Sequence, residues 1–353
     1  MSDDERYMQM ALDLAASAPF SSPNPKVGAV IVKDGTVLSR GIHRGPATDH
    51  AEIVALNGTD PTGATCYVNL EPCTHEGRTP PCVPTLVASG ISRVVAALED
   101  PDARVRGRGL AYLEEHGVVV TVGVLAEQAR RLNAPYLHHR MTGRSFLVLK
   151  LALTLDGRLS EPDRTWLTGP AARRIVHERR AAADAVMVGA GTIAADDPLL
   201  TARDVDAMRQ PLRIVVDSSG RTPPSAAAFG GEAETLVATT ERAPHEALIG
   251  WKEAGAEVVV LGRRSEGVDL EELLTTLGAR GVLEVYCEGG AGLAESLLNG
   301  SLVNRLELHY APLLVGPGGP SFVGPAVTDR PREWRTLSVD RAGNDVLVTL
   351  EPV

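Results

Sequence analysis

Residues 71–82 read EPCTHEGRTPPC, and residues 50–52, upstream of them, read HAE. The predicted zinc ligands in these stretches are one histidine and two cysteines: His50, Cys73 and Cys82. Three protein ligands leave the fourth tetrahedral position open for water, as in catalytic zinc sites, and zinc lowers the pKa of that water toward ~7. Glu52 is not a ligand, and its carboxylate can carry the water proton to a leaving group. The stretch predicts a catalytic site with one Zn²⁺ per chain and Glu52 as the proton-transfer residue.

The order of these residues is typical of zinc deaminases that act on nucleobases, whose signature is H-x-E…P-C-x-x-C. The gap between Cys73 and Cys82 is wider here. The apolar run 53–56 places HAE in the first turn of a helix, and a second helix is expected to begin near Cys82. Taken singly, Asp49 and Glu52 also fit a helix-capping pattern, and the cysteines also fit ordinary buried thiols. Their joint occurrence favours the zinc site.

Length and composition limit the class of protein. A chain of 353 residues suggests two domains, and 44% hydrophobic with 23% charged residues is typical of a globular protein. No apolar run approaches the ~20 residues that span a bilayer, and the acidic N-terminus does not resemble a signal peptide, so a cytoplasmic location is expected. A net charge of −10 and 4% aromatic residues argue against a nucleic-acid partner and favour a small-molecule substrate. Cys66 and Cys287 lie in apolar runs and are expected to be buried.

The first half of the chain alternates helical and strand patterns. Lys33-Asp34-Gly35 is a turn signal between two strand-like runs, which predicts a β-hairpin. A hairpin followed by alternating strands and helices predicts a sheet covered by helices. The expected elements are a helix over 4–17, strands over 27–32 and 36–39, a helix over 50–57, a strand over 66–70, a helix over 82–90, a strand over 93–97, a helix over 106–116, a strand over 118–122 and a helix from about 125.

A short polar break at 141–144 predicts a domain boundary, with domains over 1–144 and 145–353. The second half begins a fresh series. Its expected strands cover 146–155, 185–188, 212–216, 235–239, 257–261, 282–287, 305–314 and 346–350, and its expected helices cover 170–183, 270–279 and 292–298. No G-x-G-x-x-G follows its first strand, so a Rossmann site is not indicated. Residues 288–294, EGGAGLA, join a strand to a helix through glycines, which fits either a phosphate-binding turn or a plain tight turn.

Several motifs together resemble the family of bifunctional riboflavin-biosynthesis enzymes that combine diaminohydroxyphosphoribosylaminopyrimidine deaminase with 5-amino-6-(5-phosphoribosylamino)uracil reductase. In the first half they are PNPKVG at 23–28, HAE at 50–52 and residues 71–82. In the second half they are KLALTLDGR at 150–158, WLTG at 166–169, GT at 191–192, ADDP at 195–198 and EGG at 288–290. The wide cysteine spacing fits this family better than cytidine or tRNA adenosine deaminases.

The resemblance implies an α/β protein with an N-terminal cytidine-deaminase-like three-layer domain and a C-terminal dihydrofolate-reductase-like domain. It implies zinc-hydroxide deamination of 2,5-diamino-6-ribosylamino-4(3H)-pyrimidinone 5′-phosphate, followed by NADPH-dependent reduction of the ribosyl side chain to ribityl. It also implies assembly as a homo-oligomer. The preference for NADPH over NADH rests on the resemblance alone, because the sequence offers no arginine that can be assigned to the 2′-phosphate.

Motif by motif, the resemblance places cofactor contacts at Ala152, Trp166, Thr168, Thr192, Asp196, Gly290, Ala291, Gly292, Leu293, Ala294, Glu295 and Ser296. It places substrate contacts at Asn24, Arg164, Arg180, Leu200, Arg203 and Glu288. Arginine forks hold phosphate bidentately, although a lone arginine is more often a solvated surface charge. Asn24 also fits a turn between prolines. The roles of His43, His75 and Asp156 stay open.

Two other functions compete with this reading. One is a deaminase of another nucleobase or nucleoside with a non-catalytic C-terminal binding domain, which would leave WLTG and the Asp196-Asp197 pair unexplained. The other is a zinc-stabilised structural protein without catalysis, which would not need Glu52.

Overall fold

A computed structural model describes residues 1–18, 20–74, 80–161, 166–265, 267–316, 320–321 and 332–353. The chain divides into two units, Met1–Gly143 and Arg144–Val353, one residue from the boundary expected from the sequence. Each unit is built on a single main β-sheet. Among the described residues, no helix is long and apolar enough to cross a bilayer.

The N-terminal unit is a five-stranded sheet in the order β2-β1-β3-β4-β5, with the hairpin β1–β2 antiparallel and β3, β4 and β5 parallel. The strands are β1 (Gly28–Lys33), β2 (Thr36–Ile42), β3 (Thr65–Val68), β4 (Arg93–Ala96) and β5 (Val119–Val122). The helices are α1 (Asp3–Ala16), α2 (Ala51–Leu56), α3 (Cys82–Ala88), α4 (Arg108–Glu115), α5 (Ala126–Leu132) and α6 (Ala134–Thr142).

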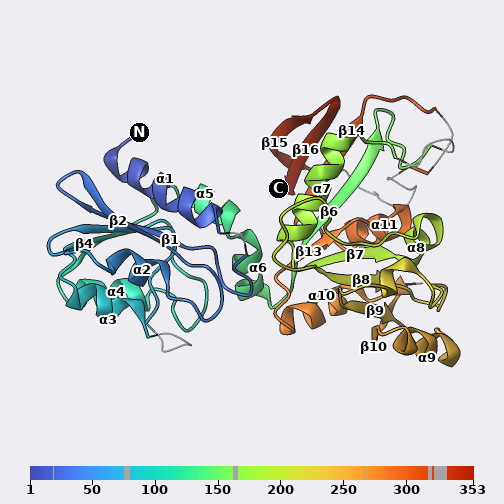
Figure 1. Ribbon diagram of the computed structural model, residues 1–353, viewed down its shortest axis with the longest axis horizontal. Helices are drawn as coiled ribbons and strands as arrows, with labels where there is room; N and C mark the ends of the chain where they lie inside the picture. Colours follow the sequence, from blue (N-terminus) through green and yellow to red (C-terminus); the bar gives the residue numbers. More distant parts are fainter. Residues whose placement is uncertain (19, 75–79, 162–165, 266, 317–319, 322–331) are drawn as a thin grey trace. The chain divides into compact units, whose positions relative to one another are not determined.

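Helices cover both faces of this sheet, which gives the unit three layers (Figure 1). The side chains of α2, α3 and α4 share one apolar core with Ala29 and Ile31 of β1. Helix α1 packs on β1 and β3. A Cβ at Gly28 would lie 2.2 Å from the Ala11 carbonyl, and one at Gly41 would lie 1.9 Å from the Ala51 carbonyl. These two glycines therefore let α1 and α2 approach the hairpin closely.

The single helix expected from residue 125 was wrong: two helices, α5 and α6, meet at Asn133. The buried Asn133 side chain accepts a hydrogen bond from the Lys26 amide at 2.8 Å and donates one to the Lys26 carbonyl at 2.9 Å. Pro135, in the first turn of α6, cannot continue the hydrogen-bond ladder of α5. The break therefore ties the C-terminal helices of the unit to the segment that enters β1.

The C-terminal unit is a nine-stranded sheet in the order β10-β9-β8-β7-β13-β6-β14-β16-β15. The first seven strands of this order are parallel, and β16 and β15 add an antiparallel end (Figure 1). The strands are β6 (Phe146–Thr154), β7 (Ala185–Gly189), β8 (Leu212–Val216), β9 (Thr235–Thr239), β10 (Glu257–Val260), β13 (Glu284–Cys287), β14 (Arg305–Ala311), β15 (Trp334–Ala342) and β16 (Asp345–Pro352), and a separate hairpin joins β11 (Arg263–Arg264) to β12 (Gly267–Val268).

Two apolar cores lie on opposite faces of this sheet. Helices α10 (Leu270–Ala279) and α11 (Ala291–Asn299) pack on one face, with alternate side chains of β7 such as Met187. On the other face, Val186 and Val188 share a core with α8 (Ala190–Asp196) and α9 (His245–Glu253). Helix α7 (Pro170–Ala182) and a short 3₁₀ turn, η1 (Ala227–Phe229), complete the unit. Because both faces are covered, the central strands β7 and β9 are buried along nearly their whole length.

The sequence did not predict α8, α9 and β15 of this unit, nor the short hairpin β11–β12 and the turn η1. The expected buried positions of Cys66 and Cys287 are confirmed, since both side chains are fully buried. The glycine-rich segment expected to join a strand to a helix does so, from β13 to α11.

Candidate functional site

The three predicted zinc ligands lie together at the N-termini of two helices. His50 is the N-cap of α2, Cys82 opens α3, and Cys73 lies in the segment that leads from β3. The Nδ1 atom of His50 is 3.1 Å from the Cys82 sulfur and 3.4 Å from the Cys73 sulfur, and the two sulfurs are 3.6 Å apart. Among the described residues this is the one group of at least three His, Cys, Asp or Glu side chains close enough to share a metal. One imidazole and two thiols form a donor set that fits zinc.

The protonation of the cysteine pair also fits a metal site. The contact between the two sulfurs, and then that with the ring of His50, lowers the pKa of Cys73 to about 4. The same pairing, with burial, raises the pKa of Cys82. The pair therefore holds one proton at neutral pH, and a divalent cation displaces it on binding.

Glu52 is buried in the first turn of α2 and lines the same cavity as His50 and Cys73. Burial, and then the charge of Cys73, raises the pKa of its carboxyl. A carboxyl with a raised pKa holds a proton more readily than an exposed one, which suits a residue that accepts and returns a proton. The carboxyl thus has the burial and the position that proton transfer at this cavity needs.

His43 fixes the orientation of Asn24 beside the cluster. The His43 Nδ1 atom lies 3.1 Å from the Asp49 carbonyl, and its Nε2 lies 2.9 Å from the Asn24 side-chain nitrogen. A carbonyl only accepts, so Nδ1 carries the proton and Nε2 accepts from the Asn24 amide. Burial lowers the pKa of His43 and keeps this neutral form. The amide oxygen of Asn24 is then the atom left to accept from a ligand.

The sequence reading missed a loop that completes this cavity of about 140 Å³. The buried Glu71 carboxylate accepts from the amides of Asp100, Gly107 and Gly109 at 3.1, 3.0 and 2.8 Å, so it holds the loop after β4 against the zinc cluster. The loop and helix α6 add six lining residues: Asp100, Asp102, Arg104, Val105, Tyr136 and Arg140. The place of this loop could have been predicted, because it follows a parallel strand, and the carboxyl ends of parallel strands meet at one edge of a sheet.

Two contacts set the charge of these added residues. The Arg104 guanidinium hydrogen bonds to Asp102 and holds the pKa of that carboxyl well below its usual range. Burial raises the pKa of Asp100, and the Tyr136 hydroxyl donates to it at 3.0 Å.

The C-terminal unit contains a larger cleft, of about 940 Å³, at the carboxyl ends of its parallel strands. Eight predicted cofactor residues line it: Thr192, Asp196, Gly290, Ala291, Gly292, Leu293, Glu295 and Ser296. A Cβ on Gly191 or Gly292, which both line the cleft, would meet no atom within 4 Å, so the backbone borders open space there. The volume and the glycine-lined helix start fit a dinucleotide phosphate.

The remaining predicted cofactor residues do not line this cleft. Ala294 is fully buried and packs into the core. Ala152 lies on β6 beside His309 of β14. Trp166 is 60% exposed, with the Arg173 guanidinium 5.3 Å from its ring centroid, and Thr168 is buried before α7.

Two predicted substrate residues bind each other. Arg180 and Glu288 form a bidentate ion pair, and Arg180 also donates to the Thr201 carbonyl at 3.0 Å. Burial alone would raise the pKa of Glu288, but Arg180 outweighs it and holds that pKa below its ordinary value. Leu200 is buried in the core, and Arg203 is exposed, with its amide 3.2 Å from His177 Nδ1. Arg164 and His75 lie outside the described residues.

Asp156 ties the turn after β6 to a distant loop. Its carboxylate accepts from the Thr154 hydroxyl at 2.7 Å and from the amides of Val315 and Gly316 at 3.2 and 2.7 Å. The hydrogen bond from Thr154 leads the contacts that lower its pKa to about 2.

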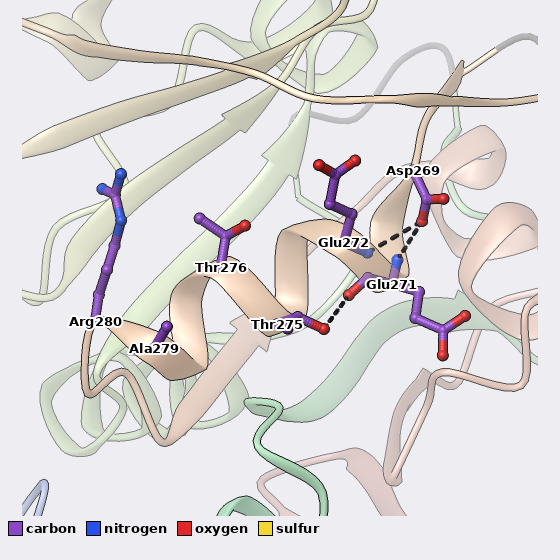
Figure 2. A pocket seen from close by; sticks show the side chains of 7 residues that line it. All are labelled: Asp269, Glu271, Glu272, Thr275, Thr276, Ala279 and Arg280. Carbon is purple, nitrogen blue, oxygen red and sulfur yellow. Dashed lines mark hydrogen bonds between the residues drawn. The ribbon is translucent and has the colours of Figure 1, made fainter.

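Figure 2 shows a further hollow, of about 570 Å³, along one helix. Its seven lining residues run from Asp269, the N-cap of α10, to Arg280 at the end of that helix, and none is a predicted site residue. Its visible hydrogen bonds are internal to the helix, namely the N-cap bonds of Asp269 and the Thr275 hydroxyl to the Glu271 carbonyl.

Two protein-family models and several known proteins match this chain. The model for the cytidine and deoxycytidylate deaminase zinc-binding region matches residues 1–98, and the model for the RibD C-terminal domain matches residues 145–348. The riboflavin biosynthesis protein RibD of Escherichia coli K12 is 39% identical over 330 residues, 89% of each chain. The RibD of Haemophilus influenzae is 36% identical and covers 99% of this chain and 98% of its own.

Solved structures are similar over the full length. The structure of Acinetobacter baumannii RibD superposes with a TM-score of 0.87 at 32% identity, covering 99% of both chains. The deaminase/reductase structure from Thermotoga maritima gives 0.86 at 32% identity, also over 99% of both chains. Together with the two sheets described above, these matches confirm the expected fold class.

Proposed function

The chain belongs to the RibD family of bifunctional riboflavin-biosynthesis enzymes, and we propose that Met1–Gly143 carries its deaminase site and Arg144–Val353 its reductase site. The protein is an enzyme with both activities, and it uses zinc and NADPH to act on a small molecule. The substrate of the first step is 2,5-diamino-6-ribosylamino-4(3H)-pyrimidinone 5′-phosphate, and that of the second is its deaminated product. A non-catalytic C-terminal domain is not favoured, since the RibD C-terminal model covers it.

In the deaminase site, His50, Cys73 and Cys82 hold the metal. Zinc, when bound, acidifies water and so supplies a nucleophile at neutral pH. Glu52 takes the proton from the attacking water and passes it to the departing amino nitrogen. Water adds to the ring carbon, the C–N bond breaks, and ammonia leaves. Asn24, oriented by His43, accepts a hydrogen bond from the pyrimidine.

In the reductase site, NADPH supplies the hydride that reduces the ribosyl group to ribityl. The protein positions the two reactants. The glycines at the start of α11 hold the dinucleotide phosphates, and the ionised Glu288, held by Arg180, accepts a hydrogen bond from the substrate. Arg203 and Arg164 are proposed to bind the substrate phosphate.

The observation that carries this proposal is the zinc-type cluster in one unit and the dinucleotide-sized cleft in the other. The test follows ammonia release and NADPH oxidation with the purified chain and the diaminopyrimidine phosphate. Glu52→Gln is expected to stop both signals with this substrate, yet to oxidise NADPH normally with the deaminated one. Failure of Glu52→Gln to oxidise NADPH with the deaminated substrate would refute the assignment of one activity to each unit.

We also propose a homo-oligomer and a cytoplasmic location. The oligomer is supported by strand β15, an edge strand on which Val339 is 63% exposed, because an exposed edge can pair with another chain. Light scattering after size exclusion tests the oligomeric state. The location is supported by four free thiols and no disulfide among the cysteines, and cell fractionation tests it.

A further inference from the structure

The cleft of the C-terminal unit crosses the ends of neighbouring strands in a fixed order. Its lining includes Gly290 after β13, Gly189 and Gly191 after β7, and Val216 and Ser218 at the end of β8. These three strands are neighbours in the sheet. An extended ligand in the cleft therefore runs from β13 toward β8.

The orientation of NADPH in the cleft follows from the proposed function, on which this inference rests. Glu288, which directly follows β13 and binds Arg180 of α7, marks the substrate end. The hydride-donating ring must meet the substrate there, so the adenosine of NADPH extends toward the loops after β8 and β10.

The loop after β8 is held by buried hydrogen bonds and presents one cation. The buried Asp217 carboxylate accepts from the amides of Gly220 and Thr222 at 3.0 and 2.6 Å. The buried Trp251 indole donates to the Thr222 carbonyl at 2.9 Å. Arg221 lies between these anchored residues and lines the cleft with its side chain exposed. Within the described ranges, no ion pair engages it.

A second cation comes from the β11–β12 hairpin. Arg264 lines the same cleft and lies 3.2 Å from Glu271. Glu271 is shared with Arg144, at 2.7 Å. Because Arg144 shares the charge of Glu271, the Arg264 guanidinium is only partly neutralised.

We propose that Arg221 and Arg264 bind the 2′-phosphate of NADPH and thereby make the reductase select NADPH over NADH. The two cofactors differ only by this phosphate, which is a hydroxyl in NADH. A guanidinium offers two parallel N–H donors to phosphate oxygens, whereas it gains little from a hydroxyl. The neighbouring Ser218 hydroxyl, also on the cleft wall, can add a donor.

Titration calorimetry on the full chain tests this with two probes, 2′,5′-ADP and 5′-AMP, which differ only by the 2′-phosphate. The wild-type protein is expected to prefer 2′,5′-ADP. Losing charged hydrogen bonds in R221A/R264A should weaken 2′,5′-ADP binding by about ten- to hundredfold and leave 5′-AMP binding unchanged. R221K/R264K should recover part of the loss. R341A, which removes an exposed arginine from β15, is the matched control and should change neither affinity.

Three results would count against the proposal. If R221A/R264A still prefers 2′,5′-ADP as strongly as the wild type, the two arginines do not read the phosphate. An equal loss of 5′-AMP binding would show a general effect on the cleft and would also overturn it. If the wild-type protein binds neither NADPH nor the probes, the proposed cofactor site in this cleft is wrong. If the wild-type protein binds NADPH normally and R221A/R264A binds the probes as the wild type does, only the role of the two arginines is wrong.

Discussion

The guanidinium of Arg180 and the carboxylate of Glu288 form a two-point ion pair, with Nε–Oε1 at 2.6 Å and Nη2–Oε2 at 3.0 Å. Their side chains are only 11% and 13% exposed. The pair joins helix α7 to the end of β13. A buried charge that loses its partner is strongly destabilised, so each residue depends on the other.

The first prediction concerns this pair. Glu288→Gln leaves Arg180 buried without a counter-charge and is expected to lower the free energy of unfolding by about 3 kcal/mol. Replacing both residues, as in Arg180→Met with Glu288→Leu, should restore part of that loss. Urea denaturation measures the free energy of unfolding of each variant. The exposed pair Arg174–Glu178 is the control, and Glu178→Gln should change stability by less than ~1 kcal/mol. Equal stability of Glu288→Gln and the wild type would contradict the prediction.

The second prediction concerns the metal. Cys82→Ser is expected to reduce bound zinc and abolish ammonia release, because one of three ligands is lost. NADPH oxidation with the deaminated substrate should continue, because the cleft lies wholly in the other unit. Elemental analysis gives the zinc content. Cys66→Ala, a buried cysteine outside the cluster, should keep its zinc. Full zinc occupancy in Cys82→Ser would remove Cys82 from the ligand set.

The third prediction separates positioning from metal binding. His43→Ala should keep its zinc but lower kcat/KM for deamination by about ten- to hundredfold, because Asn24 loses the contact that orients it. Asn24→Ala should show a similar loss. The double variant should be little worse than either single one, since both changes remove the same interaction. Additive losses in the double variant would show that the two residues act separately.

The grouping of His50, Cys73 and Cys82 was predictable because the three residues are close in sequence and few in type. His50 precedes α2 and Cys82 opens α3, and helix starts have local signals, whereas Cys73 follows β3 and was identified by the order of the motif. Segment 290–296 was correctly expected at a junction of strand and helix, and it lines the cleft except for Ala294, which turns into the core.

What the sequence could not predict depends on contacts between distant segments. Arg180 and Glu288 are 108 positions apart, so nothing local shows that they pair. Helix α9 was missed because Trp251 is its one fully buried side chain, and Gly250, a poor helix residue, instead lets the Pro224 ring approach. Strand β15 is an exposed edge with polar positions. Arg221 could be assigned only once the order of β7, β8 and β13 was known.

The fourth prediction is a pH dependence of stability that depends on His309. This side chain lies on β14, is 2% exposed, and has no hydrogen-bond partner for its Nδ1 among the described residues. Burial, and then the charge of Lys150, lowers its pKa to about 3. The charge of Glu288 raises the pKa of His309, and the charge of Arg179 lowers it further.

The sign follows from linkage. The unfolded chain binds a proton at His309 below pH ~6.5, whereas the folded chain stays neutral there until the pH nears 3. This residue therefore contributes stability above pH ~6.5 that is lost as the pH falls toward 3, by at most about 1.4 kcal/mol per pH unit. In His309→Gln, which does not titrate, the free energy of unfolding should fall less between pH 6.5 and 4.5 than in the wild type. Urea unfolding at both pH values measures the difference, and His116→Gln, an exposed histidine, is the control. Parallel curves for His309→Gln and the wild type would show that His309 is not held neutral in the folded protein.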